Sequence, residues 1–196
     1  MSKWLDVIFP PICKSCKEPC NTRLFCLPCW EECALPDPAL RCRHCFEEEE
    51  DEICPQCRNK PQLAFPSAFV FETSSPALYL CQAAIEECPE VLASFAFVQW
   101  ERLGWPIPDV VIPCPGSLLV AKPFACLLNR PCFNVLRSWN GNWSCDTSVL
   151  NEDRCFLLFS MENSMDDLAS GIDALIQAFP KKIFVLTLMP FIETEK

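Results

Sequence analysis

The chain has 196 residues, of which 51% are hydrophobic and 21% are charged, so it can build a buried core and does not belong to the disordered class. Its net charge is −10, with 8 basic and 11 acidic residues in 1–62 (−3) and 8 basic and 15 acidic residues in 63–196 (−7). Neither part has the positive balance that non-specific binding to a phosphate backbone requires, which argues against a broad nucleic-acid surface.

The 17 cysteines indicate a reducing compartment. Eight of them form four Cys-x-x-Cys pairs, and the other nine lack the regular spacing of a disulfide framework. Residues 1–6 do not have the long apolar region of a secretory leader, and the apolar runs 117–121 and 155–159 are too short to cross a bilayer. We therefore expect a cytoplasmic location and no membrane insertion.

Residues 13–57 contain the four pairs, which predict two zinc ions. One Cys-x-x-Cys turn supplies two thiolates to a metal, and a second turn completes a tetrahedron. The even spacing favours zinc over an iron–sulfur cluster, and the segment has so few apolar residues that metal must supply its folding energy. Four-thiolate sites have no open coordination position, so both ions are predicted to be structural. The predicted ligands are Cys13, Cys16, Cys26, Cys29, Cys42, Cys45, Cys54 and Cys57.

Spacing alone leaves the pairing of the four turns open between a sequential and a cross-braced arrangement. Nine residues separate the first turn from the second, and eight separate the third from the fourth; these short intervals favour the sequential arrangement. His44, the only histidine, and the nearby Cys20 and Cys33 are predicted not to be ligands. The acidic run 47–52 is predicted to be a solvated loop, with a site for a basic partner as the alternative.

After a linker at 58–66, short apolar runs alternate with helical segments, as is typical of an α/β fold with a mainly parallel sheet. The Asn-Gly-Asn sequence at 140–142 predicts a hairpin or loop over 138–151, and the last strand, helix and strand form a βαβ unit. We expect two domains, a small double zinc ribbon over 1–60 and an α/β domain over 61–196. The predicted strands are 69–72, 109–113, 156–159 and 183–188, and the predicted helices are 76–88, 90–103, 118–128 with an interruption at Pro123, and 165–179.

Several of these segments resemble the ComF family of competence proteins. The opening 4–11, which leads into the first Cys-x-x-Cys turn, the double zinc ribbon and the run 69–72 are similar to that family, and 109–115 resembles its Asp-strand-Pro-x-Pro segment. The resemblance implies a type I phosphoribosyltransferase-like body and a role in DNA uptake. It also implies single-stranded DNA or other competence proteins as partners.

Residues 155–168 stand where the family has its phosphoribosyl pyrophosphate loop. The family pattern is four apolar residues, two aspartates, two apolar residues and Thr-Thr-Gly-Ala-Thr. Here Phe159 and Ser160 replace the acidic pair and Met165 replaces the glycine, so close approach of the backbone to a phosphate is lost. Asp166 and Asp167 would also repel a phosphate, since like charges about 4 Å apart cost about 4 kcal/mol at a protein surface. This vestigial loop, which instead matches a helix start capped by Ser164, consists of Asn163, Ser164, Met165, Asp166 and Asp167.

The sequence therefore predicts a ComF-like zinc protein whose body has lost catalysis and acts by binding, with no catalytic residues and no small-molecule substrate. One alternative is an interaction scaffold that uses the ribbons and the acidic loop. Another is a residual phosphoribosyltransferase that uses Glu162, Asp166 and Asp167 with a divalent ion. Contact with single-stranded DNA would need exposed aromatic side chains on which bases can stack. The candidates are Trp100, Trp105, Trp139 and Trp143, and the alternative is that these side chains are buried in the core.

Overall fold

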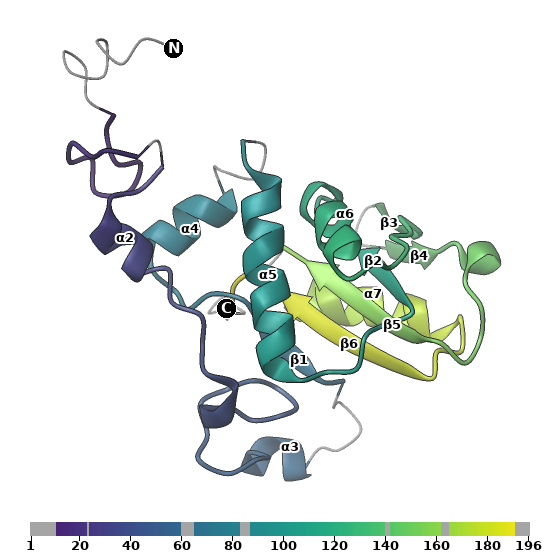
Figure 1. Ribbon diagram of the computed structural model, residues 1–196. Helices are drawn as coiled ribbons and strands as arrows, with labels where there is room; N and C mark the ends of the chain where they lie inside the picture. Colours follow the sequence, from purple (N-terminus) through teal and green to yellow (C-terminus); the bar gives the residue numbers. More distant parts are fainter. Residues whose placement is uncertain are drawn as a thin grey trace.

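A four-stranded parallel sheet forms the centre of the molecule, in the order β1–β6–β5–β2 (Figure 1). The computed structural model describes residues 11–22, 24–59, 65–82, 87–139, 142–161 and 165–190. The predicted α/β class with a mainly parallel sheet is confirmed, and α7 (Met165–Ile176) links β5 to β6 as a βαβ unit. The strands are β1 (Ser67–Phe69), β2 (Val110–Pro113), β5 (Cys155–Ser160) and β6 (Lys182–Thr187).

Both faces of the sheet are buried, and each has its own hydrophobic core. Along β5, Leu157 and Phe159 point into one core while Phe156 and Leu158 point into the other, and all four are fully buried. A strand covered on both faces is apolar at every position, which explains the continuous hydrophobic runs in the sequence. Each such side chain contributes about 1.5–3 kcal/mol through its removal from water.

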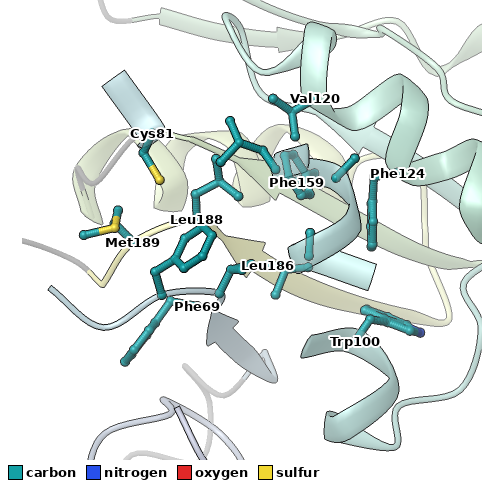
Figure 2. Close-up of a cluster of buried hydrophobic side chains, with 14 of the residues drawn as sticks. Phe69, Cys81, Trp100, Val120, Phe124, Phe159, Leu186, Leu188 and Met189 are labelled. Carbon is teal, nitrogen blue, oxygen red and sulfur yellow. The ribbon is translucent and has the colours of Figure 1, made fainter. Parts of the chain in front are cut away.

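One face is covered by α4 (Ser75–Gln82), α5 (Pro89–Leu103) and α6 (Leu118–Leu127). Figure 2 shows Trp100 of α5 and Phe124 of α6 on this side, with Phe159 and Leu186 of the sheet. The other face is covered by α7 and by the antiparallel hairpin of β3 (Leu136–Trp139) and β4 (Asn142–Cys145). Within the ranges that the structure describes, no helix has the length and apolar character needed to cross a membrane.

Local sequence signals account for several helix ends. Pro89 occupies the first turn of α5, where its missing N–H is not needed, and Gly104 ends the helix with a left-handed φ of 62°. The Ser74 side chain accepts a hydrogen bond from the backbone N–H of Ala77 (3.3 Å) and caps the start of α4. Phe179, with φ of 48°, lies beyond α7.

Several predicted boundaries are wrong. The strand expected at 69–72 is β1 at Ser67–Phe69, because the chain bends after Phe69 even though Val70 still donates to the carbonyl of Thr187 (2.9 Å). The helix expected at 76–88 is α4, which begins at Ser75, and residues 87 and 88 are not helical. The interruption expected at Pro123 does not occur, since α6 continues through it although proline lacks the N–H that would bond to the carbonyl of Leu119. The last helix ends at Ile176 and not at residue 179.

In the described residues 11–22 and 24–59, the amino-terminal part contains only short elements. Figure 1 shows it as two lobes joined by the segment that runs from α2 alongside α5. These elements are α2 (Leu27–Glu31), a 3-10 helix (Pro38–Leu40) and α3 (Pro55–Asn59). In the body, a second 3-10 helix (Thr147–Val149) follows the β3–β4 hairpin.

Candidate metal centres

The eight predicted ligands form two separate groups of four sulfur atoms. Within each group the Sγ atoms lie within 4.8 Å of one another. The grouping is the sequential one that the spacing favours: Cys13, Cys16, Cys26 and Cys29 form the first group, and Cys42, Cys45, Cys54 and Cys57 form the second.

The sulfur separations fit a tetrahedral metal site. A zinc–sulfur bond of about 2.3 Å gives a tetrahedron with edges of about 3.8 Å. The Sγ atoms of Cys16 and Cys26 are 3.7 Å apart, and those of Cys45 and Cys54 are 3.6 Å apart. Four sulfur donors at this spacing are compatible with zinc in both groups.

The two groups share one backbone frame. In each, the residue after the first Cys-x-x-Cys turn has a left-handed conformation, with φ of 65° at Lys17 and 64° at Phe46. The N–H of Lys17 donates to the carbonyl of Cys13, and the N–H of Phe46 donates to that of Cys42, each over 3.0 Å. This tight turn brings the two sulfur atoms of a pair to the same side, as one metal ion requires.

Backbone N–H groups also point at one sulfur atom of each group. The N–H of Cys26 donates to Sγ of Cys13, and that of Cys54 donates to Sγ of Cys42, each over 3.3 Å. Burial acts to raise the pKa of Cys13 and Cys42, but hydrogen bonds from backbone N–H groups, led by these two, outweigh it and lower each pKa to about 6. Each group therefore offers a thiolate at neutral pH before a metal binds.

Two of the other thiols are held protonated by burial. Burial raises the pKa of Cys29 to about 12 and that of Cys57 to about 11. Thiolate is the form that binds zinc, so metal binding at these two positions would release protons.

His44 is outside the second group of sulfur atoms. Its backbone N–H donates to Sγ of Cys42 (3.5 Å), and its carbonyl accepts hydrogen bonds from the N–H and the hydroxyl of Ser67, both at 2.8 Å. His44 thus connects the second group to the first residue of β1.

The first group is attached to the body by aromatic residues. Phe25 is fully buried and makes edge contacts with Trp30 (5.0 Å between ring centroids) and Tyr79 (5.8 Å). Trp30 in turn stacks against Phe95 of α5 at 6.1 Å. The first lobe, which we define as residues 11–33 around this group, therefore packs against α4 and α5.

The second group is attached by a buried arginine and a phenylalanine. Phe46 makes an edge contact with Phe69 of β1, with ring centroids 5.1 Å apart. The Arg41 side chain is 8% exposed, pairs with Glu48 (3.1 Å) and with Glu72, and lies over the ring of Phe69 at 5.3 Å. The second lobe, residues 40–59, is therefore fixed to the edge of the sheet at β1.

The segment between the lobes is bonded to α5. The buried Gln99 donates to the carbonyl of Pro36 (3.0 Å), and Arg102 donates to that of Leu35 (3.3 Å). The core on this side of the sheet also includes side chains of both lobes. The metal-binding part and the body thus share one hydrophobic core.

A groove of about 610 Å³ lies between the segment 34–37 and the second lobe, and Glu72 of the body also lines it. The sequence offered one signal for it, the acidic run 47–52, and none for the contribution of Glu72. Its lining residues are Ala34, Leu35, Pro36, Asp37, Leu40, Arg41, Glu48, Glu49, Glu50 and Glu72.

The edge of the sheet where the family pattern expects acidic residues carries hydroxyl groups instead. Phe159 packs against Phe124 at 5.3 Å, and Ser160 is buried at the end of β5. Ser117 accepts a hydrogen bond from the N–H of Met161 (3.0 Å), and Thr187 donates to the carbonyl of Met189 (2.8 Å). At least two of these hydroxyl groups are thus engaged in internal bonds.

Part of the vestigial loop is outside the described residues. This holds for Asn163 and Ser164, and for Glu162, which was considered for a residual activity. Met165, Asp166 and Asp167 form the first turn of α7, and only their backbone is described. The capping role predicted for Ser164 therefore stays a prediction.

The four tryptophans considered for base stacking have different surroundings. Trp100 is 1% exposed and belongs to the core, so it is not a stacking residue, and Trp105 packs on Trp100 at 5.3 Å between ring centroids. The Trp143 indole N–H is buried, and its ring closely faces Gly171. Trp139, in contrast, is 78% exposed at the end of β3.

No protein-family model matches the chain, and a search of curated proteins returned no match.

Proposed function

We propose that the protein is a ComF-type zinc protein, located in a reducing cytoplasm, that acts by binding a protein partner and not by catalysis. The observation that carries this proposal is the position of the groove. It is formed by the second lobe, the segment 34–37 and Glu72 of the body, so metal binding to the second lobe would build part of a recognition surface.

The chemistry of the two cysteine groups supports a structural role for the metal. Each group supplies four thiolates, and a zinc ion held by four thiolates has no position left for a substrate. The ions would stabilise the two lobes, whose helices are short and which add only a few side chains, such as Phe25 and Phe46, to the core shared with the body.

The body is proposed to be a phosphoribosyltransferase-like domain that has lost its sugar-phosphate site. Phe159 and Ser160, which replace the two acids of the family pattern, are buried and cannot contact a ribose. β5 therefore ends without the two carboxylates that the family pattern places there.

Contact with single-stranded DNA is supported less well. Such contact needs several aromatic platforms in a basic groove, whereas among the four candidates only Trp139 is largely exposed. The carboxylates of the groove would also repel phosphates.

The test combines metal analysis with a binding measurement. We expect two zinc ions per chain by mass spectrometry and no heat on titration of the full chain with phosphoribosyl pyrophosphate and magnesium. Heat that saturates at one ligand per chain would overturn the proposal in favour of a residual enzyme. Absence of zinc from freshly purified protein would overturn the structural role of the metal.

A further inference from the structure

We propose that the groove lined by the segment 34–37, the second lobe and Glu72 binds a basic segment of a partner protein, with an apolar side chain of the partner against its apolar lining residues. This inference deepens the proposed function and rests on it, because it names the class of partner that the same surface would take. The volume of about 610 Å³ lies within the range of about 300–1,000 Å³ that is usual for ligand-binding clefts.

Part of the groove lining is apolar. Ala34, Leu35 and Pro36 come from the segment between the lobes, and Leu40, which is 63% exposed, comes from the start of the second lobe. A large exposed apolar side chain in a groove is a suitable contact for an aliphatic side chain of a partner.

The rest of the lining is mainly acidic. Five carboxylates line the groove and only one cationic side chain, that of Arg41, does so, which gives a local charge of −4 (five negative, one positive). Arg41 is already paired with Glu48 and Glu72, whereas no ion pair is found for Glu49 or Glu50 within the described part of the chain. The five carboxylates are Asp37, Glu48, Glu49, Glu50 and Glu72.

The groove carboxylates are not gathered into one cluster. In the described ranges, the only sets of three or more candidate ligand atoms within 4.8 Å of one another are the two cysteine groups. Dispersed negative charges beside apolar lining residues complement a chain with several separate cationic side chains.

The groove is held in shape by backbone bonds. The N–H of Glu72 donates to the carbonyl of Ala34 (3.1 Å), and the N–H of Glu49 donates to that of Leu40 (3.1 Å). The Gln99 side chain of α5 donates a hydrogen bond to the carbonyl of Pro36 and so holds this lining residue in place. Because the walls are ordered before a partner arrives, less conformational entropy is lost on binding.

The experiment uses the full, zinc-loaded chain and a fluorescein-labelled five-residue peptide with a central leucine and two arginines on each side. Fluorescence anisotropy at about 50 mM salt should show saturable binding that weakens as salt increases. The double variant Glu49→Gln/Glu50→Gln should weaken binding about fivefold, and Leu40→Ser should weaken it to a similar extent. Thermal melting and zinc content, measured on the same samples, should stay unchanged because these substitutions leave Arg41 and its partners in place.

The matched control is Glu87→Gln/Glu152→Gln, which removes the same charge from exposed positions outside the groove. If this control weakens binding as much as the groove variant does, only net charge matters and the proposal is overturned. Equal binding of a peptide with serine in place of its leucine would likewise overturn it. A further outcome is a chain that holds two zinc ions, shows no binding of phosphoribosyl pyrophosphate and yet does not bind the peptide. That result would reject this inference and leave the proposed function standing.

Discussion

The two cysteine groups have the same backbone frame but different relations to the body. In the first, the left-handed residue is Lys17, which is exposed, whereas in the second it is Phe46, which is 2% exposed and packs on β1. Cys16 of the first group is exposed, while its counterpart Cys45 is half-buried. The shared frame therefore comes from what one metal ion demands, and the differences come from what each lobe packs against.

The comparison can be tested first by removing one ligand from each group. Cys45→Ser and Cys16→Ser should each reduce zinc from two ions per chain to one, and Cys45→Ser should lower the melting temperature more. A structural zinc ion contributes on the order of 10 kcal/mol, which is comparable to the stability of a whole domain. Mass spectrometry and thermal melting provide the measurements. Equal melting temperatures for the two variants would show that both lobes are coupled equally to the body.

The second test compares the two left-handed positions. Phe46→Ala should lower the free energy of unfolding by about 3–5 kcal/mol, because a buried ring is lost and leaves a cavity beside Phe69. Lys17→Ala should change it by no more than about 0.5 kcal/mol, because that side chain is exposed. Urea denaturation of both variants checks this, and a large loss in Lys17→Ala would contradict the assigned difference.

The third test concerns the arginine that joins the second lobe to the body. Arg41→Ala should cost about 2–3 kcal/mol, since it removes a buried cation and leaves Glu72, which is 38% exposed, without its partner. Arg43→Ala is a matched control in the same lobe. Its ion pair with Glu52 is exposed, so its loss should cost less than about 1 kcal/mol. Similar unfolding free energies for the two variants would count against a buried role for Arg41.

The smallest expected effect lies in the segment between the lobes. Gln99→Leu should cost about 1–2 kcal/mol because the carbonyl of Pro36 loses its buried donor. Arg102→Ala, which removes an exposed donor to the carbonyl of Leu35, should change the free energy of unfolding by less than about 0.5 kcal/mol. Native-state hydrogen exchange in α5 and β1 would show whether the effect spreads from this contact.

The sequence by itself determined which cysteines come together and most of the elements of the body. Cys-x-x-Cys spacing is a local property, since two cysteines three positions apart meet in one tight turn. The continuous apolar runs at β2, β5 and β6 likewise predict strands with both faces buried. The helix predicted at 90–103 likewise corresponds to α5, which begins one residue earlier at Pro89.

Only the tertiary structure decided which surfaces these parts form together. The groove combines residues 34–41 with 48–50 and Glu72, and Arg41 contacts a residue that is 31 positions away in the sequence. The burial of Trp100 and the exposure of Trp139 also depend on which helix or hairpin covers which face of the sheet. These features rest on long-range packing, because the free energy of a contact between distant segments depends on the whole arrangement of the core and leaves little trace in any local pattern.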